Sequence, residues 1–286
     1  METRLINVPL DLTIAIPTKD AEGHLKECLD AIPEGLARRV VIIDSGGTDS
    51  TLKIAREQGA EVVDFLWDGR FPKKRNWFLR NHPPGTEWVL FLDADEILTP
   101  AFRSEIERTL PGSTKSGYWL NYTIHFLGKP LRGGYPLRKL ALFRVGAGEY
   151  ERIEEDHWSA LDMEVHEHPV IDGEVGEIRA RIDHRESESM ARYIAKHNEY
   201  SSWEAARIIT ASSKMPIIGN WTWKQKVKSH LAQSFMAGPL YFFGSYFLIG
   251  GFRDGIRGFV FAMLKASYFT QIYCKICEMK NSKNYS

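Results

Sequence analysis

The first hundred residues alternate short apolar runs with segments whose apolar positions recur at helical spacing. Apolar runs predict strands at 12–16, 40–43, 61–64 and 87–92, and the spacing predicts helices at 21–31, about 52–58 and 72–81. The runs at 40–43 and 88–92 are continuous rather than alternating, which is typical of strands buried on both faces of a parallel sheet. The alternation of strand and helix predicts an α/β domain with a doubly wound sheet.

After residue 100 the pattern changes. We expect a short helix at 101–110, β-rich segments at 118–126 and 139–144 with a turn at 133–136, loops and short strands at 145–185, and a long helix at 187–212. Continuous βα alternation therefore ends near residue 100.

Polar residues follow the first, second and fourth apolar runs, at Pro17–Asp20, Asp44–Gly47 and Asp93–Glu96. Right-handed crossovers place the carboxyl ends of parallel strands on one edge, where open α/β sheets bind ligands. Asp93 and Asp95 are one residue apart, a spacing that suits a hard divalent cation holding phosphate oxygens. A solvated turn that starts the next helix is the alternative.

The loop after Asp44 has neither the Gly-x-Gly-x-x-Gly pattern of dinucleotide folds nor a Walker A pattern. This argues against a nicotinamide enzyme and a P-loop kinase. The Asp44 carboxylate could accept from a nucleotide base or a ribose, or it could cap the following helix. Lys73, Lys74 and Arg75 could balance a pyrophosphate, or they could form a solvated basic helix face.

Charge is unevenly distributed along a chain whose net charge is zero. Residues 214–286 contain ten Lys and Arg against two acids, a net charge of +8, which leaves −8 for residues 1–213. The three cysteines form no disulfide framework, and we interpret them as free thiols in a reducing compartment. The N-terminus lacks the features of a signal peptide.

Residues 235–252 carry no charge but contain Pro239 and four glycines. The run is short and interrupted for a spanning helix, which needs about 20 apolar residues. Aromatic residues and Lys or Arg around it and around 256–273 favour helices lying in a membrane interface. Its apolar content argues against nucleic-acid binding. A helical layer packed on the sheet, or an oligomer interface, is the alternative.

Four motifs in register resemble the family-2 glycosyltransferases of the GT-A fold; they are Ile16–Asp20, Ile43–Thr51, Arg75-Asn76 and Trp88–Glu96. Weaker matches resemble the branch that builds bacterial lipopolysaccharide core and other envelope glycans; they are Tyr135-Pro136, Leu140–Arg144, Val165–Glu167, His184 and Gly251–Gly255. The loop after Asp44 departs from the commoner pattern of two acids followed by Gly-Ser, which weakens any inference about the nucleotide or the sugar.

The resemblance implies a mostly parallel central sheet flanked by helices, and an inverting transferase that uses a nucleotide sugar with uracil as the usual base. The implied donor-binding residues are Pro17, Thr18, Asp20, Asp44, Ser45, Arg75, Asp93, Ala94 and Asp95. Asp93 and Asp95 would hold Mn²⁺ or Mg²⁺, Asp95 most directly, and His184 resembles a late histidine that completes the metal shell in some GT-A enzymes.

The general base implied by the resemblance is Glu167, with Glu155 and Asp156 as alternatives. Two other classes of function stay open. One is a phosphohydrolase of the haloacid dehalogenase type with Asp93 as nucleophile. The other is a nucleotide-binding scaffold without turnover.

These observations predict a transferase domain over 1–213, with a nucleotide-binding half at 1–100 and an acceptor-binding half with the long helix at 101–213. Residues 214–286 are predicted to form a basic, aromatic, helical segment that associates with a membrane. The expected acceptor is a glycolipid or a lipid-linked saccharide at the cytoplasmic face of the inner membrane.

Overall fold

The structure is a computed structural model that describes residues 9–152, 162, 169–185, 189–213, 231 and 233–282. The chain forms two compact units. The first comprises Met1–Ile124 and Pro136–Arg185, and the second comprises His125–Tyr135 and Glu186–Ser286. The predicted division into a transferase domain over 1–213 and a membrane-associating segment over 214–286 stays a prediction.

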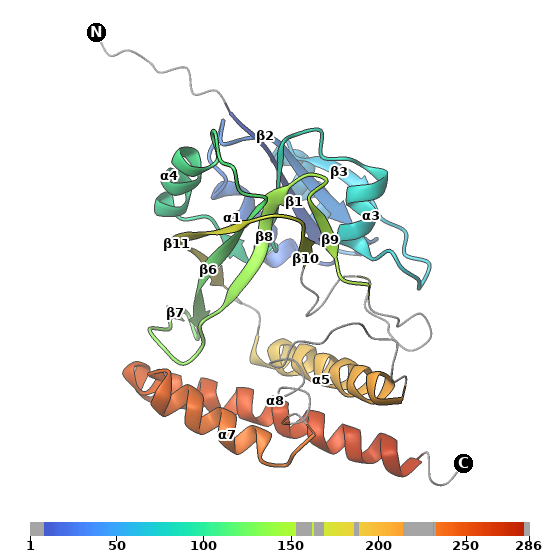
Figure 1. The fold of residues 1–286 in the computed structure, drawn as a ribbon, viewed down its shortest axis with the longest axis vertical. Helices are drawn as coiled ribbons and strands as arrows, with labels where there is room; N and C mark the ends of the chain where they lie inside the picture. The colour runs from blue at the N-terminus through green and yellow to red at the C-terminus, as the bar shows by residue number, and fades with distance from the viewer. Residues whose placement is uncertain are drawn as a thin grey trace. The chain divides into compact units, whose positions relative to one another are not determined.

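The first unit begins with four parallel strands in the spatial order β3-β2-β1-β4 (Figure 1). These strands are β1 (Leu10–Thr18), β2 (Ala37–Asp44), β3 (Glu61–Asp64) and β4 (Trp88–Phe91). The helices between them are α1 (Glu22–Asp30), α2 (Thr51–Glu57) and α3 (Lys74–Asn81). Every strand and helix predicted from the first hundred residues is present.

Beyond β4 the sheet continues as β8, β6, β11 and β5. Strand β8 pairs antiparallel with both β4 and β6, and β11 pairs antiparallel with β5. The remaining elements of this half are β5 (Glu96–Ile97), α4 (Pro100–Thr109), β6 (Gly117–Phe126), β8 (Arg138–Arg144), β9 (Gly148–Tyr150), β10 (Pro169–Ile171) and β11 (Val175–Arg185). Strands β9 and β10 form a separate pair. The predicted α/β class is confirmed, but the expectation of a mostly parallel sheet is corrected to a mixed sheet. The parallel pairs join β3, β2, β1 and β4, and the pairs named above beyond β4 are antiparallel.

The core of the first unit lies on both faces of the sheet. Because successive strand residues point to opposite faces, Ile14 and Ile16 of β1 join one hydrophobic cluster and Ala15 joins the other. In the same way Leu90 of β4 packs into the first cluster and Phe91 into the second. Burial on both sides explains why these strands are continuous apolar runs in the sequence.

The second unit is mostly helical. Its elements are β7 (Lys129–Pro130), α5 (Met190–Ser213), α7 (Ala237–Phe243), the π-helical turn η1 (Gly244–Leu248), the 3₁₀ turn η2 (Gly251–Asp254) and α8 (Gly255–Ser282). Ile208 of α5 packs in one buried cluster with Ile272 and Ile276 of α8. Among the residues that the structure describes, no helix is long and apolar enough to cross a membrane.

A loop of the second unit is bound closely to η1 and η2. Asp254 accepts backbone hydrogen bonds from Arg132 at 2.9 Å and from Gly133 at 3.1 Å. A side chain on Gly133 would place its Cβ 2.4 Å from the carbonyl oxygen of Gly250, so only glycine fits there. The Gly-Phe-Arg-Asp-Gly motif at 251–255 therefore holds the loop that leads into β8.

Candidate active site

The carboxyl ends of β1 and β2 are joined by hydrogen bonds to Asp44. Its carboxylate accepts from the Thr18 hydroxyl at 2.9 Å and from the backbone N–H groups of Gly46 and Gly47 at 2.9 and 3.2 Å. Only 1% of Asp44 is exposed. These bonds hold the loop that follows β2. They do not cap the following helix, because α2 begins at Thr51 and its N-cap residue is Ser50. A contact between Asp44 and a nucleotide stays a prediction.

Asp20 joins the loop after β1 to the loop after β2. Its carboxylate accepts from the backbone N–H of Thr48 at 2.7 Å, and its own backbone has a positive φ of 50°. A Cβ on Gly47 would lie 2.9 Å from the Asp20 backbone nitrogen, so the two loops approach as closely as glycine allows. Pro17 is buried in β1 just before this junction. The predicted donor-binding residues of these two loops therefore form one connected structure.

Lys74, at the start of α3, is buried beneath the same loops. Its ammonium donates to the Thr18 carbonyl and to the Ser45 hydroxyl, both at 2.8 Å, and lies 3.3 Å from the Asp162 carboxylate. Burial lowers the pKa of Lys74, although Asp162 acts in the opposite direction. The alternative of a solvated basic helix face is wrong for Lys74, which is 2% exposed.

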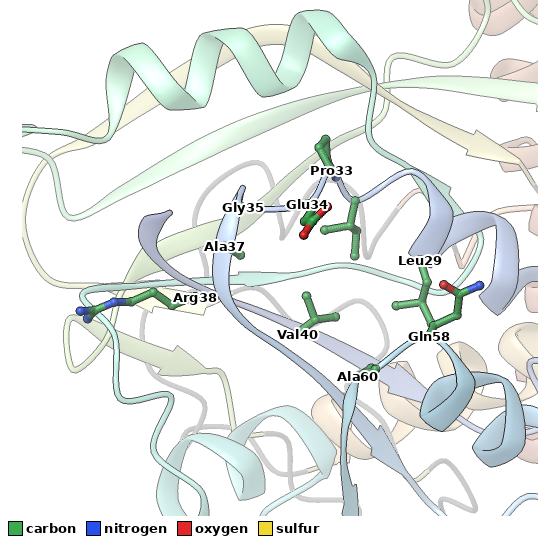
Figure 2. A pocket seen from close by; sticks show the side chains of 11 residues that line it. Leu29, Pro33, Glu34, Gly35, Ala37, Arg38, Val40, Gln58 and Ala60 are labelled. Atoms are coloured by element: carbon green, nitrogen blue, oxygen red, sulfur yellow. The ribbon is translucent and has the colours of Figure 1, made fainter. Parts of the chain in front are cut away.

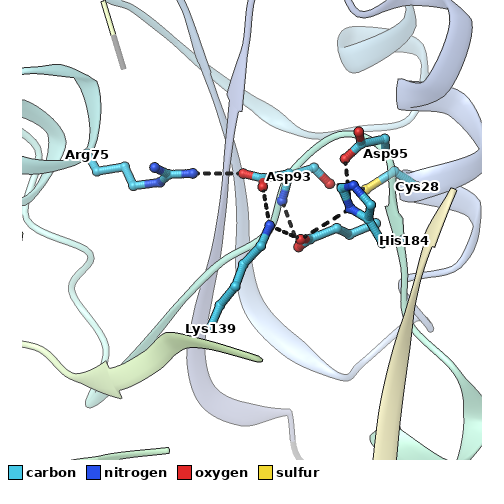
Figure 3. A network of polar contacts seen from close by, with 7 residues as sticks. Cys28, Arg75, Asp93, Asp95, Lys139 and His184 are labelled. Atoms are coloured by element: carbon cyan, nitrogen blue, oxygen red, sulfur yellow. Dashed lines mark hydrogen bonds and ion pairs between the residues drawn. The ribbon is translucent and has the colours of Figure 1, made fainter. Parts of the chain in front are cut away.

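The Asp-x-Asp motif lies at the carboxyl end of β4, within a network of opposite charges (Figure 3). The Asp93 carboxylate contacts Arg75 Nη2 at 2.7 Å and Lys139 Nζ at 2.6 Å. Lys139 also contacts Glu96 Oε1 at 2.5 Å, and the other Glu96 oxygen accepts from the Asp93 backbone N–H at 3.0 Å. Two cations thus flank the first aspartate of the motif.

Asp93 and Lys139 each stabilise the charged form of the other. Burial disfavours the charge of Asp93, but Lys139 and Arg75 outweigh it and lower the pKa of the Asp93 carboxyl. Burial also disfavours the charge of Lys139, but Asp93 and Glu96 outweigh it and raise the pKa of the ammonium. The nearby thiol of Cys28 is held protonated, because burial, together with the surrounding acids, raises its pKa.

His184 lies beside the second aspartate of the motif, because β11 pairs with β5 and sets His184 opposite Glu96. Its Nδ1 atom is 3.5 Å from Asp95 Oδ1 and 3.7 Å from Glu96 Oε1. Burial disfavours the charged imidazole, but Asp95 and Glu96 raise its pKa. This buried nitrogen has no hydrogen-bond partner among the residues that the structure describes.

The donor chemistry at this point fits a divalent cation in part. A carboxylate and an imidazole face each other, and both are ligands for Mn²⁺. Within the described residues, however, no three His, Cys, Asp or Glu side chains are already arranged as a metal site. Both Asp93 oxygens contact cations, so Asp95 and His184 are the better candidates for metal ligands here. The metal assignments stay predictions.

The structure brings together most of the predicted site but not all of it. Ala94 lies in the turn between the two aspartates, half-buried. The candidate bases Glu155, Asp156 and Glu167 lie outside the described residues. The sequence reasoning missed Lys139, and it assigned no separate role to Glu96, the last residue of the motif Trp88–Glu96. The segment 139–144 was expected to be a strand, but nothing in its pattern indicated that it would lie next to β4.

A pocket of about 240 Å³ lies elsewhere, among residues such as Pro33, Ala37 and Gln58 (Figure 2). Its lining includes the first residues of β2, at the opposite end of that strand from Asp44. Ligands of open α/β sheets bind at the carboxyl ends of strands. The pocket is therefore separate from the candidate active site.

The sequence of the chain is similar to those of known glycosyltransferases. Residues 13–131 match the sequence model of "Glycosyl transferase family 2". The lipopolysaccharide core biosynthesis glycosyltransferase LpsC of Rhizobium meliloti is 27% identical over 273 residues, covering 91% of this chain and 89% of that protein. An uncharacterized glycosyltransferase of Rickettsia prowazekii is 24% identical over 279 residues, covering 94% of this chain and 90% of its own.

A solved structure gives a weaker match. Glucosyl-3-phosphoglycerate synthase from Mycobacterium tuberculosis, in complex with Mn²⁺, UDP and glucosyl-3-phosphoglycerate, is 23% identical, and the match covers 40% of this chain and 44% of that one. Its TM-score is 0.32, which is too low to establish a common fold.

The family match decides between the classes of function left open by the sequence. A phosphohydrolase with Asp93 as nucleophile is wrong, because the chain matches glycosyltransferases. The predicted resemblance to family 2 and to lipopolysaccharide-core enzymes is confirmed. Residues 13–131 match the family 2 glycosyl transferase model, and the protein is a glycosyltransferase.

Proposed function

We propose that the protein transfers a sugar from a nucleoside diphosphate sugar, with UDP as the expected nucleotide, to a glycolipid or a lipid-linked saccharide. One observation carries the proposal: the Asp-x-Asp motif of a family 2 domain ends β4 between two cations, Arg75 and Lys139. Anionic and cationic groups at the carboxyl end of a parallel strand suit a metal-bound diphosphate.

The donor is proposed to lie along the ends of β1, β2 and β4. The loops after β1 and β2, held together by Asp20 and Asp44, would bind the nucleoside, with Ser45 beside them. Arg75 and the motif residues would bind the diphosphate. Because these loops are hydrogen-bonded to one another before any ligand arrives, little conformational entropy is lost when the nucleotide binds.

Asp95 and His184 are the residues proposed to hold Mn²⁺ or Mg²⁺, and Asp93 would face the same ion less directly. A divalent cation at this position neutralises charge on the leaving nucleoside diphosphate. A carboxylate base must also take the proton from the acceptor hydroxyl during an inverting transfer. Glu167 is proposed for that role, with Asp156 and Glu155 as alternatives.

The lipid nature of the acceptor is supported by the similarity to LpsC and by the surface of the second unit. Several large apolar side chains are exposed on α7, η1, η2 and α8; they include Phe243, Phe247, Leu248, Phe252, Ile256 and Met263. Leu248 is 76% exposed and Ile256 is 74% exposed. Together with the basic character of residues 214–286, this surface supports peripheral binding to an anionic membrane, at its cytoplasmic face.

The proposal is tested by incubating the protein with radiolabelled nucleotide sugars and bacterial lipid extract, in Mn²⁺ or in EDTA. We expect label in the lipid fraction only with the metal. Asp95→Asn should lower the rate by about two orders of magnitude, because a catalytic metal contributes several kcal/mol.

The matched control is Asp11→Asn, an exposed aspartate near the start of β1, at the other end of the sheet strands from the site. It should transfer sugar at the wild-type rate. Full activity of Asp95→Asn in saturating Mn²⁺ would show that the metal assignment is wrong. Label that stays in the nucleotide sugar under every condition would contradict the proposed reaction.

A further inference from the structure

We propose that Lys139 binds the diphosphate of the donor and is held ready for it by Asp93 and Glu96. The inference rests on the proposed function and adds a residue to it. Lys139 is not part of the Asp-x-Asp motif; it comes from β8, whose residues 142–144 pair with β4 in antiparallel register. Its ammonium nevertheless lies within 2.6 Å of both Asp93 and Glu96.

The hydrogen-bonding capacity of Lys139 is not exhausted by these contacts. An ammonium group has three N–H donors. Asp93 and Glu96 take two of them, and the remaining contact recorded among the described residues is with the ring of Tyr122, 5.1 Å away. One donor is thus left for an anionic oxygen, in a side chain whose position is already set by two carboxylates.

Lys74 differs from Lys139 in both its contacts and its exposure. Its ammonium donates to the Thr18 carbonyl and the Ser45 hydroxyl and lies 3.3 Å from the Asp162 carboxylate, so three oxygen atoms of the protein already surround it. Its side chain is 2% exposed, whereas that of Lys139 is 30% exposed. Lys74 therefore holds the loops together, and Lys139 is the lysine that a ligand can reach.

The negative charge of the acids at 93, 95 and 96 also requires a cation beside them. Asp93, Asp95 and Glu96 lie within four consecutive residues, and their carboxylates would repel the phosphates of a donor. Arg75, with a side chain that is 10% exposed, neutralises Asp93 from one side. Lys139 neutralises Asp93 and the buried Glu96 from another side, and it presents positive charge where the phosphates must approach.

The test is titration calorimetry with UDP, GDP and CDP and with their parent nucleosides, in EDTA and again in Mn²⁺. Lys139→Gln should weaken binding of the nucleoside diphosphate by about 10- to 100-fold, which is the range for a charged hydrogen bond. Binding of the nucleoside should not change. Arg138→Gln is the matched control, because Arg138 is the preceding residue on β8, is exposed, and pairs with Glu177; it should bind like the wild type.

Removing one partner of a buried ion pair can unfold a protein. The double variant Glu96→Gln and Lys139→Gln avoids this, since it removes one charge of each sign, and it should show the same selective loss. Wild-type diphosphate affinity in a folded Lys139→Gln or double variant would overturn the inference and leave the proposed function intact. Equal losses for diphosphate and nucleoside would overturn it as well. A wild-type protein that binds none of the three nucleoside diphosphates would overturn both.

Discussion

Two aspartates at neighbouring strand ends have different roles because their partners differ. The Asp44 carboxylate binds neutral donors, the Thr18 hydroxyl and two backbone N–H groups, and is closed off from solvent. The Asp93 side chain binds two cations and is 27% exposed. Asp44 therefore holds a loop in place, whereas Asp93 holds two cations at a surface that a ligand can reach.

Replacing Asp44 should therefore affect folding. Asp44→Ala leaves buried donors without partners, and we expect the free energy of unfolding to fall by about 1–3 kcal/mol. Urea denaturation measures this loss. Asp64→Ala is the control, because Asp64 pairs with Asp44 in register at the end of β3 but is exposed. Equal denaturation midpoints for the two variants would contradict the role assigned to Asp44.

His197 gives the second unit a pH dependence. Its Nδ1 lies 2.9 Å from the Tyr193 carbonyl and its Nε2 lies 2.9 Å from the Lys265 ammonium, an arrangement that suits the neutral ring. Burial and Lys265, with a smaller effect from Lys196, lower the pKa of His197 from 6.5 to about 4. Between these values the unfolded chain binds a proton that the folded chain does not, so stability falls as the pH drops from 6.5 to 4.

We expect His197→Gln to abolish this contribution. The stability difference between wild type and variant, measured by denaturation at several pH values, should change between pH 6.5 and 4 and stay constant above pH 6.5. Lys265→Met should raise the pKa of His197 when its imidazole is titrated by NMR. A pKa that stays at its wild-type value in Lys265→Met would show that the ammonium is not a cause.

At the scale of elements, α5 and α8 are held together by side chains that project from one face of each helix. Ile208 of α5 is 1% exposed and packs near Ile272, whereas Ile194 on the same helix is 50% exposed. The regular spacing of apolar positions at 187–212 predicted the helix, and α5 spans Met190–Ser213. The helix expected around residues 256–273 is part of the longer α8.

Removing side-chain volume from this contact should destabilise the second unit. Ile208→Ala should cost about 2–5 kcal/mol, because it leaves a cavity in a packed cluster. Hydrogen exchange of the amides of α5 and α8 measures the loss in this unit. Ile194→Ala serves as the control and should change stability by less than about 0.5 kcal/mol. Similar exchange rates in the two variants would mean that α5 and α8 do not depend on this packing.

At the scale of the whole molecule, the chain combines an acidic first part with a basic last part that exposes large apolar side chains. Replacing Leu248 and Ile256 by Glu should weaken binding to vesicles of anionic phospholipid by about 100-fold, since each buried apolar side chain contributes about 1.5–3 kcal/mol. Flotation of the protein with vesicles measures the effect.

The control for the vesicle experiment is Leu66→Glu, because Leu66 is 87% exposed but belongs to the first unit. This variant should float with vesicles like the wild type. If the Leu248 and Ile256 variant also floats like the wild type, the surface on α7, η1, η2 and α8 does not bind the membrane. An apolar surface that instead joins two copies of the chain would appear as a concentration-dependent change in mass.

The first four strands, the helices between them, and the edge on which Asp44, Asp93 and Asp95 lie could all be predicted from the order of residues along the chain. These features depend on local periodicity and on the handedness of parallel connections, both of which can be read from consecutive residues. The family resemblance could be predicted from this order as well, because the four motifs follow one another in the first hundred residues.

The side chains that surround the Asp-x-Asp motif could not be predicted in this way, because they come from strands distant in the chain. Lys139 reaches Asp93 because β8 pairs with β4, and His184 reaches Asp95 because β11 pairs with β5. A hydrophobic pattern shows that a strand is buried, but it does not identify the neighbouring strand, since pairing depends on contacts between residues far apart in the chain. The charges beside the motif therefore depend on the positions of β8 and β11, which the local hydrophobic pattern does not specify.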